Sequence, residues 1–201
     1  MTWQQRVARL ITDVTVRAPW LWPLLRRPMA RMFDRIAPHW DAFRSPDRLV
    51  AYEAALDRVP GRPRAVLDLG TGTGDGAIAI ARRWPEAEVL GIDLSGPMLD
   101  EARRKAPELR FELADASRLD VRDGAFDLVA LNNMIPFFGE LGRIVAPGGH
   151  LVVAFSLGDE TPIYVRPASL RRGLERAGFD LVEEVAAGPG TATVARRRGG
   201  R

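Results

Sequence analysis

From residue 64 onward, short apolar runs alternate with amphipathic segments of helical length. The apolar runs predict strands over 65–69, 89–93, 109–113, 126–131, 151–155, 179–185 and 191–195. The amphipathic segments predict helices over 76–84, 97–105, 137–145 and 167–177. Strands that alternate with helices build a mostly parallel sheet with helices on both faces. The last two strands are separated by the turn Gly188-Pro189-Gly190, so we expect them to form an antiparallel hairpin.

The first 45 residues follow a different pattern. The expected first helix carries one apolar stripe, which consists of Trp3, Val7, Leu10, Ile11 and Val14. Pro19, Pro23 and Pro28 then interrupt regular helix, so we expect only a short second helix over 29–36. The sequence Ser45-Pro46-Asp47 is typical of a helix start and predicts a third helix that ends near residue 59.

The positive charge of the chain is concentrated at its two ends. Residues 1–45 hold eight arginines and three aspartates, and residues 194–201 hold four arginines and no acidic residue. The segment between them has a net charge of −6, although the whole chain carries +3. We therefore expect an N-terminal helical and aromatic lid over 1–45, a main domain over 46–195 and a basic tail over 196–201. A nucleic-acid-binding domain carries its positive charge across the domain itself, so we expect no nucleic-acid partner.

The composition excludes several kinds of chemistry. The chain contains no cysteine, which rules out disulfides, thiolate catalysis and cysteine-ligated metal. Its two histidines, His39 and His150, are far apart in the sequence, so we expect no metal site. No apolar run approaches the roughly 18 residues of a transmembrane helix, and the N-terminus lacks the order of a signal peptide. We therefore expect a cytoplasmic protein.

A glycine-rich turn joins the first strand of the main domain to its first helix. It reads Val66-Leu67-Asp68-Leu69-Gly70-Thr71-Gly72-Thr73-Gly74-Asp75-Gly76. Glycines let the backbone turn tightly and approach a ligand closely. Asp93 ends the second strand, where a carboxylate can accept hydrogen bonds from a ribose diol. Two ligands are consistent with this arrangement, a dinucleotide and S-adenosylmethionine.

The acidic residues around this turn help to decide between the two candidate ligands. Asp68 lies inside the turn, where its charge would repel a pyrophosphate but could pair with the ammonium of a methionine moiety. Asp115 follows the third strand and could meet an adenine amino group. Asp75-Gly76 replaces the ending of the dinucleotide pattern G-x-G-x-x-G. These features favour S-adenosylmethionine, although each aspartate could instead be a helix cap or a turn residue.

In five motifs that occur in order across residues 64–195, the chain resembles class I S-adenosylmethionine-dependent methyltransferases. The motifs are the turn over 66–74, Gly91-Ile92-Asp93-Leu94-Ser95 followed by Met98-Leu99, Ala114-Asp115-Ala116, Phe126-Asp127-Leu128-Val129, and Arg143-Ile144-Val145-Ala146-Pro147-Gly148-Gly149. Upstream, Phe33-Asp34-Arg35-Ile36-Ala37-Pro38-His39-Trp40-Asp41 is similar to the entry segment of the ubiquinone/menaquinone C-methyltransferase branch. The resemblance implies a Rossmann-like α/β fold whose seven-stranded sheet has the order 3-2-1-4-5-7-6, with strand seven antiparallel.

The resemblance also implies a cofactor site. The residues expected to contact S-adenosylmethionine are Asp68, Gly70, Thr71, Gly72, Gly74, Asp93, Leu94, Met98, Asp115, Ala116, Asn132 and Trp40. Phe33 and Trp40 are expected to cover this site from the lid. No pair of nucleophile and base stands out, and His39 and Asn133 are the candidates for a catalytic role.

We predict a methyltransferase that moves a methyl group to a small, apolar or quinone-like acceptor by in-line displacement. The alternatives are a protein that binds S-adenosylmethionine without catalysis and an NAD(P)-dependent oxidoreductase. The sequence Asn132-Asn133-Met134-Ile135 follows the fourth strand and differs from the Asn-Pro-Pro-Tyr motif of nucleic-acid methyltransferases.

The stretch over 17–27 is rich in tryptophan and arginine, which is typical of peripheral contact with an anionic membrane. Residues 1–30 would then rest on the inner membrane surface. A lid that packs only on its own domain and a lid that contacts a protein partner are the alternatives.

Overall fold

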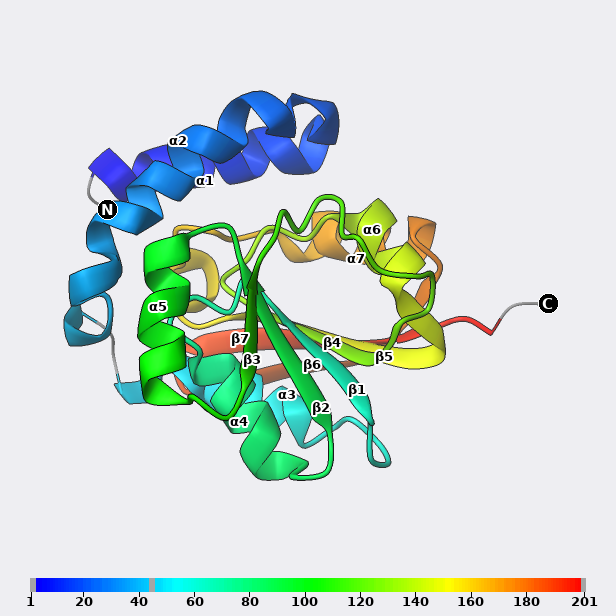
Figure 1. The fold of residues 1–201 in the computed structure, drawn as a ribbon. Coiled ribbons are helices and arrows are strands. Elements are labelled where there is room, and N and C mark those ends of the chain that lie inside the picture. Colours follow the sequence, from blue (N-terminus) through cyan, green and yellow to red (C-terminus); the bar gives the residue numbers. More distant parts are fainter. Residues whose placement is uncertain (1–2, 44–45, 200–201) are drawn as a thin grey trace.

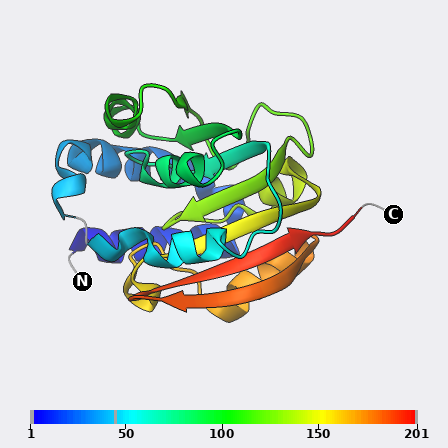
Figure 2. The ribbon, with the colours of Figure 1, turned by 90° about the horizontal axis from the view of Figure 1, so that it is seen from below.

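A sheet of seven strands forms the centre of the computed structural model, which describes residues 3–43 and 46–199 (Figures 1 and 2). The strands are β1 (Ala65–Leu69), β2 (Glu88–Asp93), β3 (Arg110–Leu113), β4 (Phe126–Asn132), β5 (Val145–Phe155), β6 (Phe179–Ala187) and β7 (Gly190–Arg197). Their order is β3-β2-β1-β4-β5-β7-β6, and β7 runs antiparallel to both of its neighbours. The expected fold class, strand order and antiparallel strand are therefore confirmed.

Helices cover both faces of this sheet (Figure 2). On one face lie α3 (Val50–Leu56), α4 (Asp75–Arg83) and α5 (Gly96–Lys105), and on the other lie α6 (Phe138–Ile144) and α7 (Pro167–Arg176). Neighbouring residues of the central strands point to opposite faces. Val66 and Leu128 therefore pack with α3 and α4, whereas Leu67 and Val129 pack with α6 and α7.

Two N-terminal helices, α1 (Trp3–Arg17) and α2 (Trp22–Ile36), form an antiparallel pair that lies across one end of the domain (Figure 1). We call them the helix pair. A 3₁₀ turn, Pro19–Leu21, joins them, and three further 3₁₀ segments, Ala37–His39, Asp41–Phe43 and Pro46–Leu49, lead into α3. The expected helix start at Ser45 lies outside the described residues.

The second helix starts earlier than expected. It begins at Trp22 and includes both Pro23 and Pro28, so the prediction of a short helix over 29–36 was wrong at its start. Pro23 lies in the first turn, where backbone N–H groups have no partner within the helix, so the missing N–H of proline breaks no hydrogen bond. Pro28 is exposed within the helix, while Trp22 and Met29 on the opposite side are buried. Burial of these side chains offsets the cost of the interior proline.

The face that α1 turns toward the domain overlaps only in part with the expected apolar stripe. The buried residues are Ala8, Ile11, Thr12 and Thr15, whereas Trp3 is 77% exposed and Leu10 63% exposed. Thr12 can be buried because its hydroxyl donates a hydrogen bond to the Ala8 carbonyl at 2.8 Å. The small inner residues let α1 approach the domain closely, while Trp3 and Leu10 remain outside.

Two strand boundaries also differ from expectation. β5 begins at Val145, because residues 147–149 belong to the strand. The pairing of β5 with β4 is irregular between Phe126 and Leu128. β7 continues to Arg197, and Arg198 Nε donates to Asp180 at 2.8 Å. Among the described residues, no helix combines the length and the apolar character that a membrane span requires.

Candidate functional site

The carboxyl ends of β1, β2, β3 and β4 meet at one edge of the sheet. The strand order reverses beside β1, which has β2 on one side and β4 on the other. In open α/β sheets, ligands bind at the carboxyl ends of the strands next to such a reversal. The loops that follow these four strands carry most of the residues expected to contact the cofactor.

The loop after β1 requires its glycines. The backbone has positive φ at Gly70 (74°), Gly72 (55°) and Gly74 (86°), a conformation that residues with a side chain rarely adopt. The Gly70 and Thr71 amides both donate to the Ile92 carbonyl at 2.9 Å, which fixes the loop to β2. A Cβ atom on Gly70 would lie 2.9 Å from Cγ of Met134. The loop is therefore packed closely at Gly70, whereas the space above Gly72 is open apart from Trp40.

Asp68 is buried beneath this loop. Its carboxylate accepts hydrogen bonds from Thr71 Oγ1 at 2.6 Å and from the Tyr52 hydroxyl at 3.0 Å. Burial raises the pKa of Asp68 to about 6, although the hydrogen bonds from Thr71, Tyr52 and the Ala77 amide lower it in part. Asp68 thus fastens the loop to α3 and to the start of α4. Its expected role as a partner of a ligand ammonium stays a prediction.

Asp93 lies at the end of β2, next to the loop. One carboxylate oxygen accepts from the Gly72 amide at 2.9 Å and the other from the Ser95 amide at 2.9 Å. Burial raises the pKa of Asp93, and the hydrogen bonds from Ser95 and Gly72 counteract this in part. Each oxygen has one protein donor and can accept further hydrogen bonds from a ligand.

Asp115, which follows β3, is in contact with the helix pair. Trp22 Nε1 donates to its carboxylate at 2.8 Å, and Arg26 forms an ion pair with it at 3.1 Å. Burial raises the pKa of Asp115, but hydrogen bonds from Ser117, Trp22 and Arg26 outweigh this, so the pKa is lowered. The expected adenine partner is thus already bound by α2.

The residues after β4 have different environments. Asn132 Nδ2 donates to the Arg48 carbonyl at 3.4 Å, while its buried Oδ1 atom has no hydrogen-bond partner within the described parts of the chain. Asn133 has a φ of 55° and exchanges two hydrogen bonds of 2.8 Å with Ser156. Asn133 therefore connects the ends of β4 and β5, whereas Asn132 presents an unused acceptor.

The segment after α2 lies over the glycine loop. Trp40 packs edge-on against Phe33, with ring centroids 5.8 Å apart, and its Nε1 lies 3.9 Å from the position of a Cβ on Gly72. Asp34 accepts from Ser95 Oγ at 2.6 Å. His39 is exposed on the 3₁₀ segment that precedes Trp40. Of the other expected contacts, Leu94 is half-buried, and Met98 and Ala116 are buried in the core.

Lys105 joins three segments at the side of the loop. Its Nζ atom lies 2.9 Å from Thr73 Oγ1, 2.9 Å from Asp75 and 2.8 Å from Asp41. Asp41 in turn accepts from Thr73 Oγ1 at 2.8 Å. This cluster holds the N-terminal segment against the loop and the start of α4.

Three residues of this region were missed by the sequence analysis. Tyr52 binds Asp68, Trp22 binds Asp115, and Met134 packs on Gly70. Met134 follows directly after the two asparagines, so its place in the chain could have indicated it. Tyr52 and Trp22 meet their partners only through tertiary folding, and the sequence carries no local signal for either contact.

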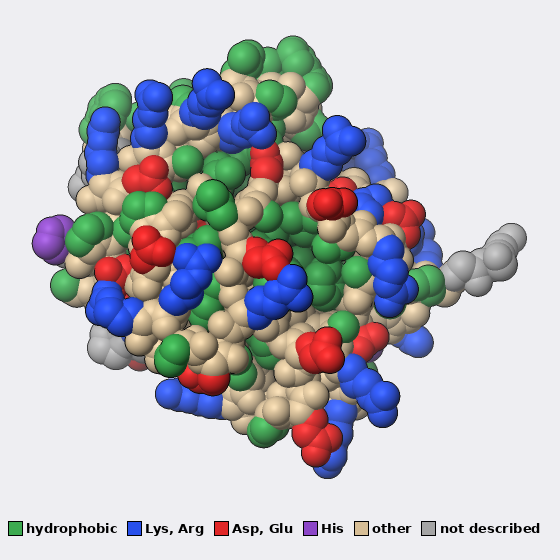
Figure 3. Space-filling model, viewed as in Figure 1, with side chains coloured by type: hydrophobic (Ala, Val, Ile, Leu, Met, Phe, Trp, Pro, Cys, Tyr) green, Lys and Arg blue, Asp and Glu red, His purple; other side chains and the backbone are tan. Residues whose placement is uncertain are grey.

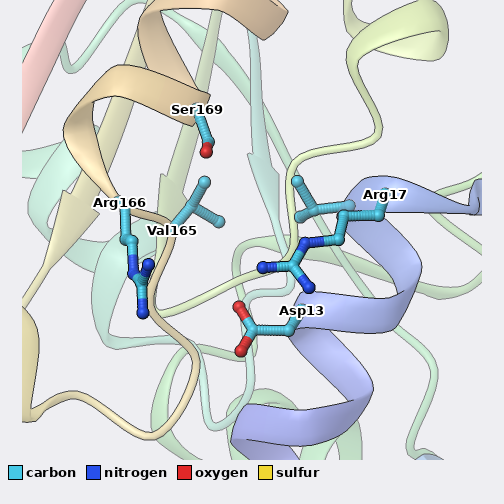
Figure 4. A pocket seen from close by; sticks show the side chains of 6 residues that line it. Asp13, Arg17, Val165, Arg166 and Ser169 are labelled. Carbon is cyan, nitrogen blue, oxygen red and sulfur yellow. The ribbon is translucent and has the colours of Figure 1, made fainter.

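A small pocket lies between α1 and the start of α7 (Figure 4). Asp13 and Arg17 extend into it from α1, and Val165, Arg166 and Ser169 line the other side. Its volume is about 60 Å³, well below the roughly 300 Å³ or more that small-molecule sites occupy. This pocket is therefore too small to hold a quinone-like acceptor.

Comparisons with known proteins agree with this geometry. Residues 66–149 match the profile of a family described as "Methyltransferase domain". The demethylmenaquinone methyltransferase of Thermus thermophilus is 43% identical over 144 residues, which are 61% of this chain and 63% of the relative. The malonyl-[acyl-carrier protein] O-methyltransferase of Xylella fastidiosa is 35% identical over 125 residues, which are 57% of this chain and 42% of the relative. The chain thus spans less than two thirds of the length of either relative.

A solved structure shows the same fold. The S-adenosylmethionine-dependent methyltransferase from Aquifex aeolicus superimposes with a TM-score of 0.67 at 20% identity, over 80% of this chain and 97% of that one. At this identity, the likeness bears on the fold alone. The matched profile, the strand order and the glycine loop with Asp93 agree with one another, and they identify residues 66–149 as a class I methyltransferase domain.

Proposed function

We propose that this protein transfers a methyl group from S-adenosylmethionine to a small apolar acceptor. The observation that carries the proposal is the carboxylate of Asp93, which Gly72 and Ser95 fix at the end of β2 beside the glycine loop. A carboxylate held in this way can accept both hydroxyls of a ribose.

The residues at the strand ends fit a cationic ligand better than an anionic one. Asp34, Asp93 and Asp115 lie around the loops after β2 and β3. A pyrophosphate in their midst would be repelled, whereas a sulfonium and an ammonium would be attracted. Above Gly72, the position of an added Cβ meets nothing but Trp40 within 4 Å, which leaves room for a ligand against the backbone.

Methyl transfer requires mainly that the methyl donor and the acceptor are aligned. When bound, S-adenosylmethionine supplies a methyl group that the positive sulfur has already activated. Asp93 and the loop backbone would fix the position of the ribose, and Asn132 Oδ1 would accept from the ligand ammonium. Orientation of two reactants at about 3 Å can supply much of the rate acceleration. Trp40 and Phe33 would exclude water from above.

The surroundings of the site support an acceptor with apolar character. Trp22 packs edge-on against Phe137 with centroids 5.1 Å apart, and Phe33 and Trp40 form a second aromatic pair. Met134 adds a flexible apolar side chain next to Gly70. The similarity to a demethylmenaquinone methyltransferase supports a quinone-like acceptor.

Calorimetric titration with S-adenosylhomocysteine, with NADH as the parallel ligand, tests the cofactor. We expect micromolar binding of S-adenosylhomocysteine alone. Asp93→Ala should weaken it by about 30-fold or more, because two hydrogen bonds to a charged group are lost. Asp100→Ala, at an exposed position on α5, is the matched control and should bind normally. Binding of NADH, or unchanged affinity in a folded Asp93→Ala protein, would contradict the assignment.

A second measurement tests the acceptor. The methyl transfer rate should be measured with a reduced hydroxynaphthoquinone and, in parallel, with a malonyl thioester that offers a free carboxylate. We expect turnover of the hydroquinone. Turnover of the thioester alone would support methyl transfer but contradict the proposed class of acceptor.

A further inference from the structure

The outer face of the helix pair exposes large apolar side chains. Trp3, Trp20 and Leu24 are 77%, 76% and 73% exposed, which makes them the three most exposed large hydrophobic residues of the described chain. Leu10 on α1 is 63% exposed. Exposed tryptophans in such a cluster are unfavourable in water and mark surfaces that contact something else.

The same face is strongly basic. The outward positions of α1 include Arg6, and those of α2 include Arg27, Arg31 and Arg35, which are all exposed. Asp13 and Asp34 are the acidic residues of the helix pair, and Asp34 is turned inward to Ser95. Figure 3 shows basic side chains in a row along the upper edge, with hydrophobic side chains beside them over the helix pair. None of these four arginines forms an ion pair within the described part of the chain.

We propose that this face, defined by Trp3, Leu10, Trp20, Leu24 and the four arginines, docks on an anionic phospholipid bilayer. Tryptophan prefers the interface between headgroups and acyl chains. Arginines beside it pair with anionic headgroups, while their methylene stems cover apolar surface. The helix pair would lie flat on the bilayer, as interfacial amphipathic helices do.

The shape and charge of this face favour a bilayer over other occupants. Trp3 and Trp20 lie at opposite ends of α1, whose 15 residues span about 22 Å. Apolar anchors spread over this distance suit an extended flat surface better than a single pocket on a protein. A second copy of the chain would bring two basic faces together, and like charges oppose such a contact.

The proposal is independent of the identity of the acceptor, but it has a geometric consequence. The inner side of the same helix pair contacts Asp115 through Trp22 and Arg26. A bilayer contact on the outer side would therefore place the candidate site directly beneath the headgroups. An apolar acceptor could then enter without crossing bulk water.

Co-sedimentation of the full chain with vesicles tests the proposal. Vesicles of equal parts phosphatidylglycerol and phosphatidylcholine should bind the protein, and vesicles of phosphatidylcholine alone should bind it much less. Arg27→Glu/Arg31→Glu should weaken partitioning by about 30-fold or more, since each basic residue near the surface contributes separately. Trp20→Ser/Leu24→Ser should also weaken it, and about 0.5 M salt should suppress binding of the wild type.

Matched controls separate this face from general charge and hydrophobicity. Arg62→Glu/Arg82→Glu changes two exposed arginines outside the helix pair, and Val182→Ser removes an apolar side chain of 49% exposure from β6. Both should sediment like the wild type. All variants should bind S-adenosylhomocysteine as the wild type does, which shows that they are folded and keeps this test apart from that of the proposed function.

Three outcomes would overturn the proposal. The first is that the wild type does not bind anionic vesicles at low salt. The second is that the helix-pair variants and the controls lose binding equally. The third is that size-exclusion chromatography finds a dimer or a complex with an acidic protein that the Trp20→Ser/Leu24→Ser variant abolishes while vesicle binding persists.

Discussion

Among single residues, the carboxyl group of Asp68 has the most unusual environment. It is 2% exposed, and its hydrogen-bond partners come from α3, the glycine loop and α4. Burial raises its pKa from 3.8 to about 6, so the folded state binds this proton more tightly than the unfolded state does. By linkage, the contribution of Asp68 to stability is greatest below about pH 4 and declines as the pH rises through about 6.

Asp68→Asn should therefore change the pH dependence of stability. The free energy of unfolding of the variant, minus that of the wild type, should increase between about pH 4 and about pH 7. A pKa difference of about two units sets an upper limit of about 3 kcal/mol on this increase. Urea denaturation at several pH values measures it, with Asp100→Asn as the control for an exposed carboxyl group. A difference that stays constant with pH would show that burial does not raise the pKa of Asp68.

At the scale of elements, the glycine loop depends on both its backbone and its neighbours. Gly61 and Gly70 have nearly the same φ, 79° and 74°, but different surroundings. A Cβ on Gly61 meets nothing within 4 Å, whereas a Cβ on Gly70 lies 2.9 Å from the Met134 side chain. A comparison of alanine substitutions at the two positions therefore separates the effect of backbone strain from the effect of steric contact.

Gly70→Ala should destabilise the protein more than Gly61→Ala does. Both substitutions place an alanine in a left-handed backbone conformation, which lowers the free energy of unfolding by roughly 1 kcal/mol. Gly70→Ala should lower it by about 1 kcal/mol more, because Met134 must move. Thermal unfolding measures both, and adding Met134→Ala should recover part of the loss at Gly70. We also expect weaker binding of S-adenosylhomocysteine in Gly70→Ala alone. Equal effects at the two glycines would rule out the close packing of Met134.

At the scale of the whole molecule, the helix pair is held to the domain at a few points. Trp22 and Arg26 bind Asp115, and Trp22 packs on Phe137. At the other end, Arg9 donates to three carbonyls between Asp159 and Pro162 and stacks over Tyr164, with its guanidinium carbon 5.4 Å from the ring centroid. Ile11 is the one large apolar side chain among the buried residues of α1, so these specific contacts add to a limited apolar contact.

Trp22→Phe should loosen the helix pair without unfolding the domain. The variant keeps an aromatic ring but loses a hydrogen bond to a charged group, which costs about 2 kcal/mol. Hydrogen exchange should then become faster in α1 and α2, while β1 and β4 stay protected. Trp84→Phe, at a tryptophan of similar burial that caps the C-terminus of α4, is the control. If exchange in the helix pair remains slow, the bond to Asp115 does not hold it in place.

The difference between local and long-range information explains what the sequence could predict. The glycine loop and Asp93 follow from patterns within short segments, and the structure places them together. The strand order was implied by the family resemblance, and the structure confirms it. The contacts of Asp68 with Tyr52 and of Asp115 with Trp22 join residues 16 and 93 positions apart. The orientation of α1 was missed because Ala8, Thr12 and Thr15 give no apolar signal, yet their small size decides which face is buried.

Lys105 provides a single site for chemical labelling of this protein. It is the single lysine among 29 basic residues, and its amine lies where the glycine loop, the start of α4 and the N-terminal segment meet. An acylating reagent would therefore find one ε-amine on the whole chain. Its rate of reaction would report how often Thr73, Asp75 and Asp41 release that amine, and thus how often the N-terminal segment lifts from the loop.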